Sequence, residues 1–89
     1  IEKRGTYDFQ TTSDDGSRLF INGFPVVDND GLHSRKTVTG NMVLKKGFHA
    51  FEVHYFERGG QESLVVKWKG SDFGWREIPA FRLFKYDSN

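Results

Sequence analysis

Short stretches of alternating apolar and polar residues run along most of this chain. No stretch keeps the three- and four-residue apolar spacing of an amphipathic helix, whereas a period of two is typical of strands that bury one face. We therefore predict an all-β chain of six or seven short strands. The expected strands cover residues 7–9, 18–21, 24–27, 37–44, 48–56, 63–69 and 81–86.

Turn-forming residues separate these strands. Asn22-Gly23 stands between two β-forming stretches, and both residues tolerate the positive φ angles of a type I′ turn, so residues 18–27 are predicted as a β-hairpin. Three further segments are polar or glycine-rich, which favours surface loops. They are residues 28–35, 57–62 and 70–75. Short strands at such intervals are typical of a β-sandwich, and we expect its strands to be antiparallel.

Two of the predicted strands have a recognisable inward face, because residues two apart share one side of a strand. The residues predicted to point inward are His49, Phe51, Val53 and Tyr55 in the first, and Leu64, Val66 and Trp68 in the second. We expect His49 to be a core or hydrogen-bonded residue. Residues 63–69 alternate cleanly enough to predict a half-buried antiparallel strand.

Composition and charge narrow the class of protein. Eighty-nine residues correspond to one domain, residues 1–89, whose small core must rely on nine Phe, three Tyr and two Trp. The net charge of +1 lacks the basic excess of a nucleic-acid binder, and the apolar runs are too short for direct membrane insertion. The chain has no cysteine, which excludes disulfides and thiolate metal sites. Because it begins at Ile1, we expect a fragment of a larger protein.

The acidic turn Asp14-Asp15-Gly16 is the first candidate for chemistry. Hard cations such as calcium prefer several oxygen ligands, and two carboxylates at the end of a strand can supply them. The alternative is an ordinary polar turn, since Asp and Gly favour turns for backbone reasons alone. Both interpretations stay open on the residues themselves.

Several motifs of this chain resemble the protective-antigen-type β-sandwich domain, also called the PA-fourteen domain. The motifs are TSDDGSRLFING at 12–23, VVDNDGLH at 26–33, LKKGFH at 44–49, VHYFE at 53–57, LVVKW at 64–68 and IPAFRL at 78–83. They resemble the carboxy-terminal two-thirds of that domain, so the resemblance implies that amino-terminal strands are missing. Unpaired sheet edges would then be open to a neighbouring protein chain.

The resemblance also implies a calcium site. In lectin-type members two adjacent aspartates, here Asp14 and Asp15, bind calcium through a cis peptide bond between them, and the ion binds sugar hydroxyls. In those members a second loop completes the site, often with an asparagine side chain. The corresponding loop here, residues 56–62, contains no asparagine. Glu57 is the expected substitute ligand, while Arg58 could instead neutralise the aspartates as an ion pair.

Further loop residues are candidates for contacts with a bound sugar. His33 is expected to orient Asp28 or Asp30, and Trp75 either stacks on a sugar ring or fills the core. The candidate ligand-binding residues are Asp30, His33, Arg58, Gln61 and Trp75.

These features together predict a non-catalytic, calcium-dependent carbohydrate-binding or adhesion module of a larger protein. The resemblance implies an extracellular or cell-surface location and a glycan or glycoprotein partner. The alternative is a structural protein-interaction module without sugar binding. An enzyme is not expected, because glycoside hydrolysis needs two carboxyl groups about 5–10 Å apart across the scissile bond, and adjacent residues of one loop are poorly placed for that.

Overall fold

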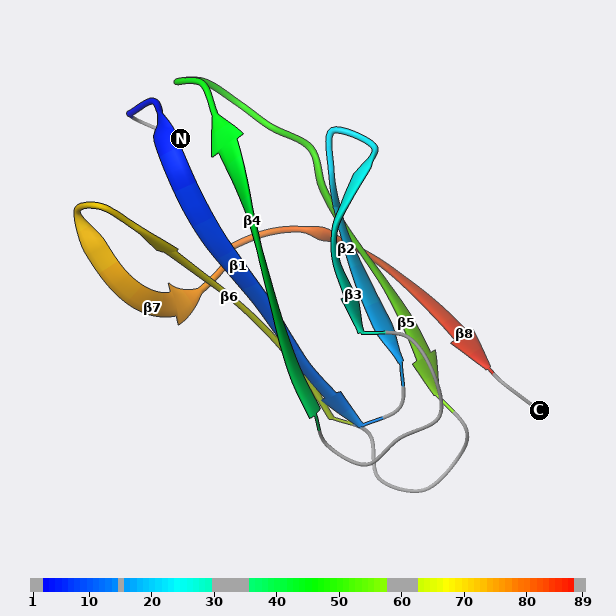
Figure 1. Ribbon diagram of the computed structural model, residues 1–89. Coiled ribbons are helices and arrows are strands. Elements are labelled where there is room, and N and C mark those ends of the chain that lie inside the picture. The colour runs from blue at the N-terminus through cyan, green and yellow to red at the C-terminus, as the bar shows by residue number, and fades with distance from the viewer. Residues whose placement is uncertain (1–2, 15, 30–35, 58–62, 88–89) are drawn as a thin grey trace.

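The computed structural model describes residues 3–14, 16–29, 36–57 and 63–87, and these form two four-stranded sheets packed face to face (Figure 1). Sheet A has the order β4-β1-β6-β7 and sheet B the order β3-β2-β5-β8. The strands are β1 Gly5–Asp14, β2 Ser17–Ile21, β3 Phe24–Asn29, β4 Lys36–Leu44, β5 Phe51–Glu57, β6 Ser63–Gly70, β7 Phe73–Glu77 and β8 Arg82–Asp87. The described residues contain no helix, so the predicted all-β sandwich is confirmed.

Strand pairing is antiparallel except at one edge. β1 lies between β4 and β6, β2 lies between β3 and β5, and β7 pairs with β6, all antiparallel. β8 pairs with β5 in parallel, from Glu52 opposite Arg82 to Glu57 opposite Asp87. The parallel pair arises because residues 78–81 carry the chain from sheet A across to sheet B before β8 begins (Figure 1).

The Asn22-Gly23 hairpin is confirmed. Asn22 and Gly23 have φ angles of 53° and 85°, as a type I′ turn requires, and β2 pairs with β3 on either side. The turn is also attached to the segment before β5. The Asn22 amide nitrogen donates to the Ala50 carbonyl (2.8 Å), and the Ala50 amide donates to the Asn22 side-chain oxygen (3.0 Å).

Two predicted boundaries and one predicted loop were wrong. β5 begins at Phe51 rather than Phe48, because the Ala50 amide bonds to the Asn22 side chain instead of continuing a ladder. The longest strand is β1, which extends to Asp14. Residues 73–75, predicted as part of the loop 70–75, belong to β7. The turn before β7 is only Ser71-Asp72, and Gly70 and Gly74 lie inside strands.

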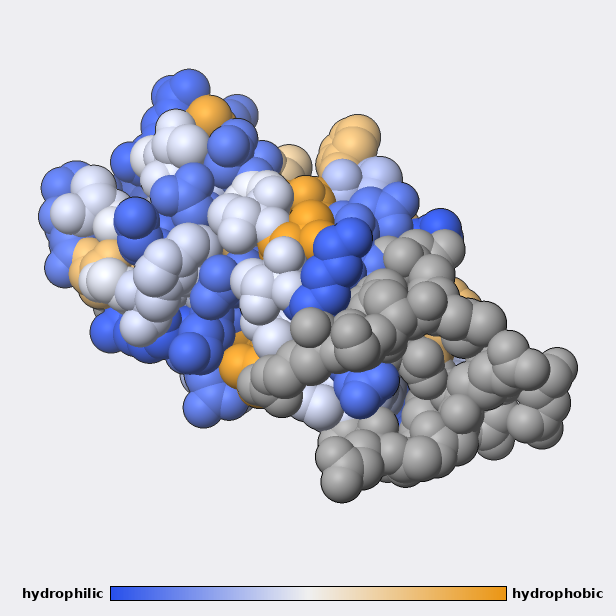
Figure 2. All heavy atoms as spheres, turned by 60° about the horizontal axis from the view of Figure 1, so that its bottom comes forward, coloured by the Kyte–Doolittle hydropathy of each residue, from blue (hydrophilic) through white to orange (hydrophobic). Residues whose placement is uncertain are grey.

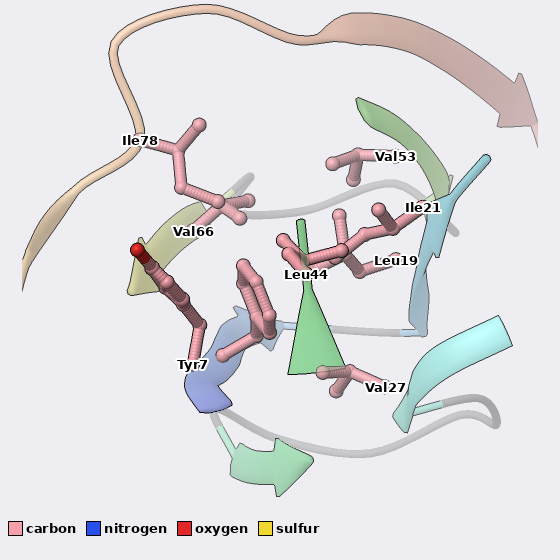
Figure 3. Packing of buried hydrophobic residues seen from close by; sticks show 9 residues of the cluster. Tyr7, Leu19, Ile21, Val27, Leu44, Val53, Val66 and Ile78 are labelled. Carbon is pink, nitrogen blue, oxygen red and sulfur yellow. The ribbon is translucent and has the colours of Figure 1, made fainter. Parts of the chain in front are cut away.

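The core lies between the sheets, and Figure 3 shows apolar side chains from both sheets pointing toward one another. Phe9, Leu19, Ile21 and Val53 are fully buried. Each such side chain contributes about 1.5–3 kcal/mol relative to an exposed one. The remaining members of the buried cluster are Tyr7, Val27, Leu44, Val66 and Ile78, with Phe51, Leu64 and Trp68 packed against them. The inward faces predicted for residues 51–55 and 64–68 are therefore confirmed.

The sandwich is closed tightly at the edge where β3 meets β4. A Cβ atom placed on Gly40 would lie 2.0 Å from the Val26 carbonyl oxygen, far inside van der Waals contact. Gly40 therefore allows the backbones of the two sheets to approach where any side chain would hold them apart.

We expect Gly40→Ala to destabilise the domain by about 1–3 kcal/mol, because the new methyl group must push β3 away from β4. Equilibrium unfolding in urea measures this change. The control is Gly74→Ala, since a Cβ atom there meets nothing within 4 Å. Equal urea midpoints for the two variants would contradict the close approach.

Candidate functional site

One end of the sandwich gathers the ends of strands from both sheets, and we call it the loop end (Figure 1, bottom). β1, β3, β5 and β8 finish there, and β2, β4 and β6 begin there. Asp14 lies opposite Ser63 in the β1–β6 ladder. Figure 2, with this end turned toward the viewer, shows mainly hydrophilic side chains among the described residues and only isolated hydrophobic ones.

The acidic turn is attached directly to β5. The Phe56 amide donates to the Gly16 carbonyl over 2.7 Å. Glu57 is the next residue along β5, and Asp14 precedes Gly16 by two residues. The fold therefore brings the backbones of Asp14 and Glu57, two of the three predicted calcium ligands, to the same end of the molecule.

A buried polar cluster lies directly beneath this end. Its members are Thr11 and Ser13 of β1, Ser17 of β2 and Asn29 of β3, each at most 2% exposed. Ser17 donates its hydroxyl to Thr11 Oγ1 (3.0 Å) and shares a 2.8 Å hydrogen bond with Ser13 Oγ. Asn29 Nδ2 donates to the Lys36 carbonyl (2.8 Å) and lies 3.3 Å from the Thr11 carbonyl. These bonds join sheet A to sheet B.

Tyr55 adds a second link between the sheets. Its hydroxyl donates to the Asp14 carbonyl (3.1 Å) and accepts from the Ser63 amide (3.0 Å), while its ring is only 1% exposed. One side chain of sheet B thus fixes the backbone of Asp14 beside Ser63 of sheet A. The alternating pattern predicted that Tyr55 points inward. It did not predict this role, because Asp14 lies 41 positions before Tyr55 and Ser63 lies 8 positions after it.

The Asp14 carboxylate is the candidate group at this end whose side chain the structure describes. Asp14 is partly exposed, and within the described ranges its carboxylate has no ion-pair partner. Within the same ranges, no three His, Cys, Asp or Glu side chains are arranged to hold a metal ion. A carboxylate on a fixed backbone can contribute to cation binding, but other ligands must complete the coordination shell.

Only some of the predicted site residues lie in the part of the chain that the structure describes. Asp14 and the backbone of Glu57 lie at the loop end, as described above. The remaining metal candidate Asp15, with the cis peptide bond that the resemblance implies, lies outside the described residues. The ligand-binding candidates Asp30, His33, Arg58 and Gln61 also lie outside them.

Trp75 lies far from the loop end. It is on β7, 40% exposed, with Lys69 Nζ 5.6 Å from its ring centroid. Lys69 is six residues along β6 from Ser63, which corresponds to roughly 20 Å at the usual rise of a strand. Sugar stacking by Trp75 stays a prediction, but Trp75 and Asp14 do not share one site.

Two other polar predictions can be placed. His49 is hydrogen-bonded, as expected: Nε2 donates to the Lys45 carbonyl (2.7 Å), so Nδ1 accepts from Asn22 Nδ2 (2.8 Å). It precedes β5 and anchors the hairpin turn rather than lying in a strand. Asp28 pairs with Arg18 at 3.3 Å on the surface.

Comparison with known proteins gives a family-level match. The sequence profile described as "PA14 domain" matches residues 1–80. A solved structure named "anti-sigma factor domain-containing protein" superimposes with a TM-score of 0.74 at 24% identity, which shows a shared fold. That match covers 100% of this chain but only 32% of the other chain. None of the curated proteins matches, and the described residues include no helix able to cross a membrane.

We expect Tyr55→Phe to lower the free energy of unfolding by about 1–3 kcal/mol, because the Asp14 carbonyl and the Ser63 amide lose their shared partner. Thermal and urea denaturation measure the change. Tyr86→Phe is the matched control, since the Tyr86 hydroxyl is exposed and its 3.3 Å bond to His54 should contribute less than about 0.5 kcal/mol. If both variants lost the same stability, Tyr55 would not link the sheets.

Proposed function

Because this chain belongs to the PA14 domain family, we propose that it is a non-catalytic, calcium-dependent carbohydrate-binding or adhesion module of a larger surface or extracellular protein. PA14 domains are often carbohydrate-binding or adhesion-related, and they typically occur in extracellular or surface proteins. The solved relative supports the view that this fold serves as one part of a longer chain. The partner in this proposal is a glycan or a glycoprotein.

The observation that supports the proposal most strongly is the way the loop end holds Asp14. Its carbonyl already accepts a hydrogen bond from Tyr55, and the Gly16 carbonyl accepts one from Phe56. The Asp14 carboxylate has no cation beside it within the described residues. An acidic group on a well-anchored backbone suits a hard cation, because little reorganisation is needed on binding.

Asp14, Asp15 and Glu57 are the proposed calcium ligands. All three offer carboxylate oxygens, which is the donor type that calcium prefers. The ion would supply a positive centre for the hydroxyl oxygens of a sugar, and Asp30, His33, Arg58 and Gln61 are the loop residues proposed to contact that sugar. A shallow site of this kind corresponds to millimolar to micromolar affinity, or about 4–8 kcal/mol.

A protein-interaction module is the second candidate, and the outer strand β8 favours it. β8 forms the edge of sheet B, and its Leu83 and Tyr86 are 51% and 41% exposed. An edge strand with exposed apolar side chains can pair with a strand of another chain. In this case Arg58 would neutralise the aspartates, and no ion would be needed.

We expect calcium titrated into metal-free protein to give heat by isothermal titration calorimetry and to raise the melting temperature. Asp14→Asn/Asp15→Asn should abolish both effects, because the double substitution removes two carboxylate ligands. Asp8→Asn/Glu77→Gln removes the same charge from β1 and β7 away from the loop end and should leave binding intact.

A glycan array probed with calcium and with a chelator then tests the sugar. Signals that vanish on chelation and in the Asp14/Asp15 variant would support the lectin proposal. If calcium gave no heat and no rise in melting temperature, the calcium-dependent proposal would be overturned. Protein partners of β8 would then be the next to test.

A further inference from the structure

A hollow of about 380 Å³ lies on sheet A at the β6–β7 hairpin, well away from the loop end. Its lining residues are Lys3, Tyr7, Trp68, Ser71, Asp72, Phe73 and Arg76. Trp68 lies opposite Arg76 in the ladder and shares the face of the buried Val66, so the hollow opens on the inner face of sheet A. In Figure 1, β7 and β8, the outer strands of the two sheets, extend to opposite sides of the molecule.

Three aromatic rings form the wall of this hollow. Tyr7 and Trp68 stack with ring centroids 5.9 Å apart, and Phe73 lies 5.1 Å from Trp68 and 6.2 Å from Tyr7. The Tyr7 hydroxyl donates to the Lys3 carbonyl, which holds the amino-terminal segment at the rim. A concave site of this volume with aromatic walls and a few polar groups is typical of small-ligand binding.

The wall contains a buried hydrogen-bond donor. Trp68 Nε1 is inaccessible to solvent and has no hydrogen-bond partner within the described residues. A buried donor without a partner is unfavourable, and tryptophan in a buried position normally finds an acceptor. Because Nε1 is closed to solvent, it is the Trp68 ring, and not its N–H, that a ligand in the hollow can reach.

The charged groups of the hollow favour an anion. Lys3 pairs with Asp72 at 3.4 Å, so these two charges offset each other. The Arg76 guanidinium lies 4.0 Å from the Phe73 ring centroid and has no carboxylate partner among the described residues. One positive charge, in the planar form that binds carboxylates through two parallel hydrogen bonds, is therefore left available.

We propose that this hollow binds an acidic sugar unit, a hexuronate, as a second site that does not use calcium. The apolar face of the sugar ring lies on the aromatic wall, and the carboxylate pairs with Arg76. Trp68 is five residues along β6 from Ser63, or roughly 17 Å, so this site is separate from the one proposed at the loop end.

Gly70 determines the shape of the wall. A Cβ atom on Gly70 would lie 2.8 Å from Cε1 of the Phe73 ring, so the ring packs directly on this glycine. Gly70→Ala must displace Phe73, and with it the Arg76 guanidinium that lies on its ring, so it narrows or distorts the hollow. Gly70 is therefore a positioning residue for the aromatic wall.

The test is a titration with a galacturonate trisaccharide in the presence of a calcium chelator, followed by the indole N–H signals in proton–nitrogen correlation spectra. The chain has only two tryptophans, Trp68 and Trp75, so each signal can be assigned by substituting Trp75. We expect the Trp68 signal to shift with saturation and the Trp75 signal to stay in place. The neutral galactose trisaccharide and acetate alone should bind at least tenfold more weakly.

Variants separate this proposal from the loop-end site. Arg76→Gln should weaken binding at least tenfold, Gly70→Ala should weaken it while leaving the spectrum of a folded protein, and Asp14→Asn/Asp15→Asn should bind as wild type. Lys69→Gln, which removes the cation near Trp75 instead, is the control. No shift of the Trp68 signal at 10 mM ligand, equal binding of the neutral trisaccharide, or unchanged binding by Arg76→Gln would overturn the proposal.

Discussion

Hydrogen bonds between the two sheets, rather than apolar contact alone, determine how the loop end of this sandwich is built. The Ser17 hydroxyl bonds to the hydroxyls of Thr11 and Ser13. The Asn29 amide donates to the carbonyls of Thr11 and Lys36. The Tyr55 hydroxyl bonds to the backbone of Asp14 and of Ser63. Apolar packing tolerates small sliding of one sheet over the other, whereas buried hydroxyl and amide bonds are directional. The position of the acidic turn relative to β5 depends on these bonds. Any chemistry that combines residues of the acidic turn with residues of β5 depends on them as well.

The sandwich has different cross-sections at its two lateral edges. At the β3–β4 edge Gly40 brings the backbones together. At the β7–β8 edge the outer strands diverge, and the hollow there is lined by Trp68 and Phe73, which are only partly buried. A small domain has few apolar residues with which to fill such a wedge. The tight β3–β4 edge and the aromatic hollow at the β7–β8 edge are therefore two outcomes of one wedge-shaped cross-section.

The sequence could predict what is local. Asn22 and Gly23 favour positive φ angles by themselves, so the sequence alone predicted the hairpin. The clean alternation of residues 63–69 predicted the buried face of β6. β7 was hidden by Gly70 and Gly74, which look like loop residues until the ladder with β6 is known. The length of β1 was hidden because Thr11 and Ser13 are buried through hydrogen bonds that come from β2 and β3. Asp14 and Glu57 were found from local chemistry and family resemblance. The hollow, in contrast, joins residues from two distant segments, 3–7 and 68–76, and no local pattern predicts it.

The parallel pairing of β8 with β5 has a mechanical consequence. The described chain begins and ends at opposite ends of a body 41 Å long, so tension applied between the termini runs along the strands (Figure 1). β8 pulled along its own axis loads all of its hydrogen bonds to β5 together, in shear, instead of breaking them one at a time. A domain connected in this way resists stretching best in the direction in which a tether between two surfaces would pull it.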